Sequence, residues 1–276
     1  MPGFLSLPIR SARPRDVGIT HVIDKGMGMR QLEDLLDTAS DYIDILKLGW
    51  GTAYVTQNVF DKIRACHQAK VPVCFGGTFL ELAILQNRFD EYRETARKAG
   101  LTHVEISNGV IDMSRKEKAN YIRELSKDFT VLSEVGSKDS EKIIPPYRWV
   151  ELIESDLEAG AWKVICEARE SGTVGLYFGT GEVRSGLVDE ITEKINQADL
   201  IFEAPQKTQQ VWLVKKFGSE VNVGNVATNE VIALETLRLG LRADTMPLFH
   251  DVEGWNAQTA EHQDPEPAQP KRRSHP

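Results

Sequence analysis

The amino-acid sequence predicts an α/β fold, a single (β/α)8 TIM barrel with parallel strands, and three observations lead to this prediction. Eight short apolar segments recur along the 276 residues. Stretches with the period of amphipathic helices separate them, an alternation that is typical of βα units. Nearly every apolar segment ends in charged or glycine-bearing residues, although parallel strands buried on both faces tolerate little charge. The carboxyl edge of the barrel, where the active sites of such barrels lie, is therefore the expected functional surface.

The eight expected strands are, in order, Thr20–Lys25, Tyr42–Leu48, Val71–Phe75, His103–Ser107, Thr130–Val135, Lys163–Ala168, Leu200–Ala204 and Val221–Asn225. Apolar residues that recur every three or four positions indicate the helices between them. Grouped by expected helix, these residues are Leu32, Leu35 and Leu36; Val59, Ile63 and Cys66; Leu80 to Tyr92, with a stop at Gly100; Tyr121, Ile122 and Leu125; and Val150, Ile153, Leu157 and Ala161. After the last strand, a further helix is expected over Val231–Leu241.

An open, doubly wound sheet is the alternative to a closed barrel. A dinucleotide-binding sheet would carry Gly-x-Gly-x-x-Gly after its first strand. Gly26-Met27-Gly28 comes nearest, but Gln31 stands where the third glycine would be. Eight repeats therefore favour closure into a barrel.

The chain reads as one domain with two tails. Residues 1–18 are expected to form an irregular lead-in, residues 19–250 the catalytic barrel, and the polar, proline-rich residues 251–276 a disordered tail. The glycine-rich segment Ser171–Val188 follows the sixth strand directly. It is either a flexible surface insertion or an active-site lid.

Composition excludes several classes of protein. The net charge is −8 with both signs interspersed, which argues against a nucleic-acid binder. No apolar stretch approaches the length of a membrane span, and the N-terminus has no signal-peptide core. The three cysteines have no paired spacing and are expected to be reduced, and no histidine spacing suggests zinc. We expect a cytoplasmic protein that binds neither nucleic acid nor membrane.

Three glutamates stand at or near the ends of consecutive expected strands: Glu105, Glu134 and Glu167. Side chains at equivalent depth in a barrel can converge, and three carboxylates would then repel one another unless a cation neutralises them. Hard oxygen ligands of this kind suit Mg²⁺. The alternative is that some of these glutamates form ion pairs with basic residues across the barrel mouth.

Basic residues gather at the same edge, and together with the carboxylates and a divalent ion they suit a small anionic substrate. They are Lys25, Lys47, Lys138, Arg169 and Lys207. The loop after the last strand begins with Gly224 and Asn225 and is followed by an expected helix N-cap at Asn229. This loop either binds phosphate through its backbone amides or is an ordinary strand–helix junction.

Several longer motifs resemble the phosphosulfolactate synthase family over about residues 17–246. They are Asp41-Tyr42-Ile43-Asp44, Lys47-Leu48-Gly49-Trp50-Gly51-Thr52, Val104-Glu105-Ile106-Ser107-Asn108-Gly109, Leu132-Ser133-Glu134-Val135-Gly136, Glu167-Ala168-Arg169-Glu170-Ser171-Gly172, Ile201-Phe202-Glu203-Ala204-Pro205-Gln206-Lys207 and Glu235-Thr236-Leu237-Arg238-Leu239-Gly240-Leu241-Arg242. These motifs are long and ordered, which makes the resemblance specific.

The resemblance implies a carbon–sulfur lyase that adds sulfite to phosphoenolpyruvate with Mg²⁺, giving (2R)-phospho-3-sulfolactate for coenzyme M or sulfolactate biosynthesis. It also implies self-association into a homo-oligomer. Combined with the residues above, it suggests Glu105, Glu134 and Glu167 as the metal cluster. Lys138, Arg169 and Lys47 are the catalytic candidates, with Lys138 as the general acid that protonates C2. Lys25, Lys207, Gly224 and Asn225 are the candidates for substrate binding.

Two other functions stay open at this point. The site could serve a Mg²⁺-enolate enzyme that uses another nucleophile or another phosphorylated acid. The chain could also be a non-catalytic, stress-associated barrel, as for plant relatives known as heat-stress-associated proteins. The concentration of charge at strand ends counts against the second alternative, because a barrel without turnover has no need of it.

Overall fold

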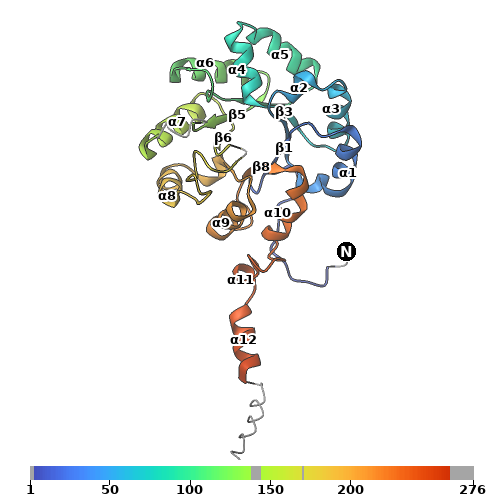
Figure 1. The fold of residues 1–276 in the computed structure, drawn as a ribbon, viewed down its shortest axis with the longest axis vertical. Coiled ribbons are helices and arrows are strands. Elements are labelled where there is room, and N and C mark those ends of the chain that lie inside the picture. The colour runs from blue at the N-terminus through green and yellow to red at the C-terminus, as the bar shows by residue number, and fades with distance from the viewer. Residues whose placement is uncertain (1–2, 138–143, 170, 262–276) are drawn as a thin grey trace, which may run out of the picture.

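The computed structural model describes residues 3–137, 144–169 and 171–261, and it confirms the (β/α)8 barrel (Figure 1). The strands pair in parallel in the order β3-β2-β1-β8-β7-β6-β5-β4, and β3 and β4 lie against each other to close the barrel. Their bounds are β1 Thr20–Asp24, β2 Ile45–Leu48, β3 Val73–Phe75, β4 His103–Ile106, β5 Thr130–Val135, β6 Lys163–Cys166, β7 Leu200–Glu203 and β8 Val223–Ala227.

Helices follow the strands in sequence, and those up to α10 surround the barrel (Figure 1). They are α1 Met29–Ala39, α2 Thr52–Val55, α3 Val59–Gln68, α4 Gly77–Leu85, α5 Phe89–Lys98, α6 Arg115–Leu125, α7 Pro146–Glu158, α8 Ser185–Lys194, α9 Lys207–Phe217, α10 Val231–Arg238, α11 Met246–Phe249 and α12 Val252–Glu261. Three short 3₁₀ turns join them to strands: η1 Ser40–Tyr42, η2 Gln197–Asp199 and η3 Thr228–Glu230.

The barrel has two apolar layers. One fills the space between the sheet and the helices. The other fills the lower part of the barrel interior, with buried side chains from β2, β3, β5, β6 and β7: Ile45, Cys74, Leu132, Ile165 and Ile201, below which lies Ile19. A closed sheet of eight strands leaves an interior that side chains fill.

The two ends of the chain differ from each other. Residues 3–18 contain no helix or strand, and Arg10 ties them to the barrel through Glu220 and Glu235, with Nε 3.0 Å from Glu235 Oε1. The C-terminal segment was expected to be disordered, but its described part forms α12, which extends away from the barrel (Figure 1). Among the described residues, none of the helices is both long and apolar enough to cross a membrane.

Candidate functional site

A pocket of about 260 Å³ lies at the carboxyl ends of the strands, as the sequence predicted. The residues that line it are Ile23, Lys47, Gly49, Trp50, Gly76, Gly77, Thr78, Glu105, Glu134, Glu167, Arg169, Glu203 and Asn225. Six of the predicted site residues are thus brought together: Lys47, Glu105, Glu134, Glu167, Arg169 and Asn225.

Lys47 on β2 carries the buried positive charge of the pocket. Its Nζ lies 3.0 Å from Glu105 Oε2 and 3.6 Å from Glu203 Oε1. Burial alone would lower the pKa of this lysine, but the nearby carboxylates outweigh burial and raise its pKa well above the ordinary value. Lys47 therefore stays protonated at neutral pH and acts as a fixed cation rather than as a base.

Glu105 on β4 is held from two sides. Its Oε1 accepts a hydrogen bond of 2.7 Å from the backbone N–H of Gly77, the first residue of α4. A Cβ on Gly77 would lie 2.4 Å from Ser107 Oγ and 2.9 Å from Ser107 N, so only glycine lets the helix approach β4 this closely. Burial, together with Glu134, raises the pKa of Glu105, and Lys47 opposes that shift.

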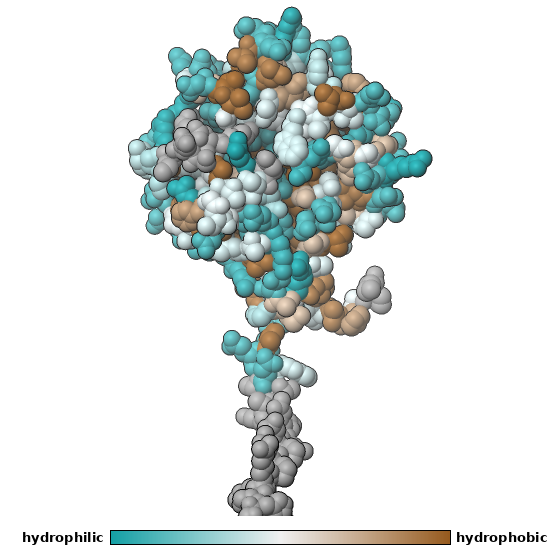
Figure 2. Space-filling view, viewed as in Figure 1, coloured by the Kyte–Doolittle hydropathy of each residue, from teal (hydrophilic) through white to brown (hydrophobic). Residues whose placement is uncertain are grey.

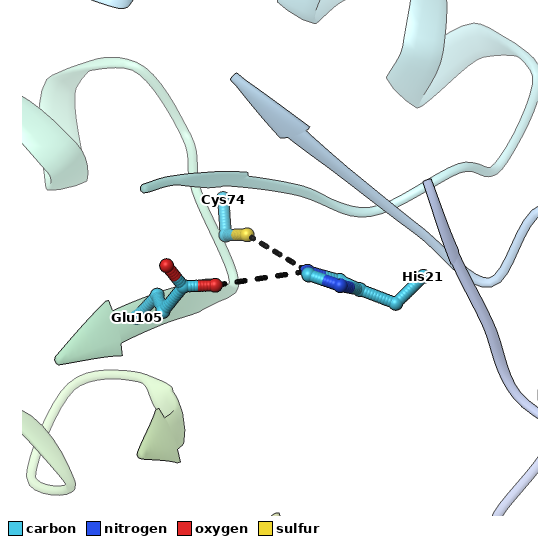
Figure 3. Close-up of side chains that lie close together, drawn as sticks. All are labelled: His21, Cys74 and Glu105. Carbon is cyan, nitrogen blue, oxygen red and sulfur yellow. Dashed lines mark hydrogen bonds and ion pairs between the residues drawn. The ribbon is translucent and has the colours of Figure 1, made fainter. Parts of the chain in front are cut away.

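A buried histidine and a buried cysteine lie close to Glu105 (Figure 3). His21 Nε2 lies 3.8 Å from Glu105 Oε2 and 4.0 Å from Cys74 Sγ. Burial and the Lys47 ammonium lower the pKa of His21, so its ring is neutral. The three donor atoms could surround a cation, but the Lys47 ammonium already neutralises Glu105 at this place. We therefore interpret this cluster as the support beneath Lys47.

Glu203 at the end of β7 is the site residue that the sequence analysis left without a role. Its Oε2 accepts a 2.9 Å hydrogen bond from the N–H of Ala168. Burial is the largest cause that raises its pKa to about 7, with Glu134 and Glu105 adding to the effect and Lys47 opposing it. Its position at a strand end, like that of Glu105, was the signal that could have identified it.

The loops after β5, β6 and β8 supply the remaining lining residues. Lys118 on α6 donates to the carbonyl oxygen of Glu134 at 2.7 Å and so fixes the end of β5. The backbone N–H of Arg169 donates to Glu167 Oε1 at 2.6 Å. Asn225 Oδ1 is buried, and no hydrogen-bond partner for it is found within the described part of the chain. A neutral oxygen is thereby left for a ligand.

The lining fits a divalent cation such as Mg²⁺. Among the described lining residues, four carboxylates (Glu105, Glu134, Glu167 and Glu203) face two cations, Lys47 and Arg169. Burial is the largest cause of the raised pKa of Glu203, and the neighbouring carboxylates Glu134 and Glu105 add to it. Oxygen donors in excess, with the orphaned amide oxygen of Asn225 beside them, match the ligands that Mg²⁺ prefers.

Four predicted site residues are not on this lining. Lys25 lies outside, its Nζ 5.1 Å from the centre of the Trp50 ring. Lys207 pairs with Asp244 at 2.8 Å. Gly224 lies in the barrel wall, where its carbonyl accepts from Ala204 N and a Cβ would meet Ile201 at 2.9 Å. Lys138 lies outside the described residues.

The loop after β8 also differs from its prediction. Asn229 was expected to be the N-cap of the last barrel helix, but it lies within η3, and α10 begins at Val231 after Glu230. The strand β8 continues to Ala227, two residues beyond its expected end, and η3 follows it directly. The loop therefore joins β8 to α10 through a 3₁₀ turn.

The glycine-rich segment after β6 is packed rather than loose. Leu176 and Tyr177 are buried, and Tyr177 OH donates to the carbonyl of Glu203 at 2.7 Å. Gly175 has a φ of +66°, and a Cβ there would lie 2.0 Å from the carbonyl oxygen of Glu167. Residues 185–188 belong to α8. The segment therefore braces the ends of β6 and β7 from outside the pocket.

A buried glutamate, which the sequence analysis also missed, shapes the loop after β4. Glu81 on α4 accepts hydrogen bonds from Ser107 Oγ at 2.5 Å and from the backbone N–H groups of Val110 and Ile111, both at 2.8 Å. Its place on an otherwise apolar helix face was a weak signal. This carboxylate joins α4 to the loop next to Glu105.

Comparison with known proteins decides the family. The family model for (2R)-phospho-3-sulfolactate synthase (ComA) matches residues 8–244. The chain belongs to the phosphosulfolactate synthase family. It is 45% identical over 244 residues to the phosphosulfolactate synthase of Bacillus subtilis, covering 87% of this chain and 97% of that protein. It is 42% identical over 249 residues to that of Methanothermobacter thermautotrophicus, covering 88% and 96%. Membership of this family supports the prediction that the chain is an enzyme.

Solved structures with much lower identity share only the fold. A 3-keto-L-gulonate-6-phosphate decarboxylase from Vibrio cholerae superposes with a TM-score of 0.52 at 9% identity, covering 80% of this chain and 97% of that one. A thiamine phosphate pyrophosphorylase from Pyrococcus furiosus gives 0.51 at 10% identity, covering 81% and 94%. These similarities support the barrel and say nothing further about the site of this phosphosulfolactate synthase family member.

Proposed function

We propose that this chain is a carbon–sulfur lyase that adds sulfite to phosphoenolpyruvate and forms (2R)-phospho-3-sulfolactate. The sulfur lone pair of sulfite forms a bond to C3, and the C2–C3 π electrons move toward C2 and its carboxylate. A proton then adds to C2, so that hydrogen and the sulfonate group are added across the double bond and no oxidant is needed. The observation that carries this proposal is the carboxylate-rich pocket with its buried ammonium, in a chain of this family.

The cations of the pocket bind the anionic groups of the substrates. Lys47 remains protonated, and at the base of the pocket it attracts the carboxylate of phosphoenolpyruvate. Arg169 is exposed at the rim and presents a planar fork that matches phosphate or sulfite. Lys25 beside Trp50 and Lys207 at the start of α9 are farther out and attract substrate electrostatically.

Mg²⁺ is the proposed cofactor. Glu134 and Glu167 would hold it, with Asn225 Oδ1 on the same lining. When bound, the ion would supply Lewis-acid stabilisation of negative charge on the substrate carboxylate. Lys138, three residues after the end of β5, is the proposed donor of the C2 proton.

An assay with purified protein tests the proposal directly. Phosphoenolpyruvate, sulfite and Mg²⁺ are mixed with the enzyme, and the product is followed by ³¹P NMR and mass spectrometry. We expect loss of phosphoenolpyruvate that requires sulfite and a divalent ion. Glu134→Gln and Glu167→Gln should each lower the rate at least 100-fold and raise the Mg²⁺ concentration needed, whereas Glu193→Gln, an exposed carboxylate on α8, should match the wild type.

Two outcomes would contradict this reaction. Phosphoenolpyruvate that stays intact under all conditions would exclude the addition. Metal-dependent consumption that is the same without sulfite would instead indicate an enolate enzyme with another nucleophile.

A further inference from the structure

Three polar side chains meet in the apolar layer between β5 and the helices outside it. They are Lys118 on α6, Ser133 on β5 and Asp156 on α7, and both helices lie beside β5 (Figure 1). Figure 2 shows hydrophilic residues spread over the outside of the barrel, where water solvates charge. The three side chains belong instead to residues that are at most 4% exposed, so contacts within the protein must compensate for their burial.

The three side chains satisfy one another through Asp156. Lys118 Nζ lies 2.7 Å from Asp156 Oδ2, and Ser133 Oγ donates to the same oxygen at 2.6 Å. Lys118 Nζ also donates to the carbonyl oxygen of Glu134 at 2.7 Å. We call Lys118, Ser133 and Asp156 the clamp. It joins α6 and α7 to one point of the backbone, the end of β5.

The carbonyl oxygen that the clamp holds lies where the ladder between β4 and β5 stops. Thr130 N donates to Thr102 O, so the even-numbered residues of β5 direct their backbone groups toward β4. The last pair of this ladder is Ile106 with Ser133, and β4 ends there. A buried carbonyl oxygen needs a donor. Lys118 supplies the donor beyond the end of β4.

The clamp holds the backbone of a residue that is proposed to bind Mg²⁺. Side chains alternate across a strand, so Ser133 contacts α7 while Glu134 lines the pocket on the other face of β5. Fixing the carbonyl of Glu134 therefore also fixes the direction in which its side chain leaves the strand. Groups that orient a metal ligand in this way are typically worth about 10–100-fold in metal affinity.

We propose that the clamp positions Glu134 for binding of the divalent ion, with Lys118 as the residue that makes the decisive contact. This inference rests on the proposed function, because it takes Glu134 as a ligand of the ion. Stability alone does not account for the clamp, since apolar residues in place of a buried ion pair often leave a protein as stable or make it more stable. What the apolar replacement would lack is the donor to the strand end.

Binding of Mn²⁺ to the full chain, measured by electron paramagnetic resonance, tests the clamp without turnover, because Mn²⁺ takes the same oxygen ligands as Mg²⁺. Lys118→Met should raise the Kd for Mn²⁺ about 10–100-fold. It also leaves Asp156 without its cation and should lower the Tm. The triple variant Lys118→Met/Ser133→Ala/Asp156→Leu removes every polar group of the clamp. It should unfold near the wild-type temperature and still show the raised Kd.

Lys163→Met is the matched control. Lys163 is also a buried lysine that donates to a carbonyl oxygen at 2.7 Å, that of Ala198, but it lies where β6 begins, at the opposite end of the barrel from the pocket. Its replacement should lower the Tm and leave the Kd for Mn²⁺ unchanged. Glu134→Gln removes the proposed ligand itself and should abolish binding, which places the measured ion in the pocket.

The outcomes separate this inference from the proposed function. With Mn²⁺ bound by the wild type, a triple variant of wild-type Kd, or a Lys163→Met variant whose Kd rises as much as that of Lys118→Met, would overturn the clamp alone. A wild type that binds no Mn²⁺, or binding that Glu134→Gln leaves intact, would refute the metal site and the clamp with it. The expected Kd values in a protein that leaves phosphoenolpyruvate and sulfite unreacted would support the clamp and refute only the reaction.

Discussion

Replacement of Lys47 by methionine should destabilise the fold, and more strongly at high pH than at low pH. The side chain is 6% exposed, and its Nζ lies 3.0 Å from Glu105 and 3.6 Å from Glu203. At an effective dielectric constant of 20 these distances correspond to Coulomb energies of about 6 and about 5 kcal/mol. Desolvation offsets most of this gain, so the useful quantity is the effect of removing one partner, about 3–5 kcal/mol for a buried pair.

The sign of the pH dependence follows from the two carboxylates. Without Lys47, the folded-state pKa of Glu105 and Glu203 rises further above the unfolded value of about 4.3. Stability from a group with a raised folded pKa is complete below the unfolded pKa and is lost as the pH rises through the folded pKa. The loss in Lys47→Met should therefore be small near pH 5 and largest near pH 8.

Urea denaturation of the wild type and of Lys47→Met at pH 5 and pH 8 measures this difference. Lys215→Met, which replaces an exposed lysine on α9, controls for the loss of a charge. Adding Glu105→Gln to Lys47→Met should restore part of the stability at pH 8, because one unpaired carboxylate is removed. A loss at pH 8 no larger than that at pH 5, or no recovery in the double variant, would refute the reasoning.

Three further predictions concern the pocket. Gly77→Ala should lower stability by about 1–3 kcal/mol, measured in urea, and should slow turnover, because its Cβ would meet the Ser107 backbone; Gly179→Ala, with nothing within 4 Å, should leave both unchanged. Removal of divalent ions with EDTA should abolish sulfite addition, and Mg²⁺ should restore it in the ³¹P NMR assay; full activity in EDTA would exclude the cofactor. Arg169→Gly should keep or raise the melting temperature, because φ there is +55°, yet lower kcat/KM at least 100-fold; a destabilised but active variant would contradict this.

Much of the fold could be predicted because strand burial and helix period are local signals. The second strand is shorter than expected, since Ser40–Tyr42 forms a 3₁₀ turn before β2 begins at Ile45. The third strand begins at Val73, after Pro72, which cannot donate to the ladder. Helix α12 was missed because its sequence has no apolar face that a pattern could detect.

The site could be predicted in part because strand ends converge in a barrel. That geometry places Lys47, Glu105 and Glu134 on one pocket without any knowledge of register. It does not say which way a terminal side chain points. Lys207, which pairs with Asp244 away from the pocket lining, was therefore grouped with Lys47, and Glu203 was left without a role. Such choices depend on contacts between loops that are distant in the sequence.

Three residues that line the pocket have an unusual backbone conformation that the sequence pattern did not predict. Trp50, Arg169 and Asn225 all have φ between +53° and +55°, and all three line the pocket. Glycine would adopt this conformation freely, whereas a larger side chain is held there at a cost on the order of 1 kcal/mol or more. Asparagine tolerates the conformation, but tryptophan and arginine do so rarely. Because the chain keeps tryptophan and arginine in this conformation at the pocket, we propose that their side chains serve ligand binding there.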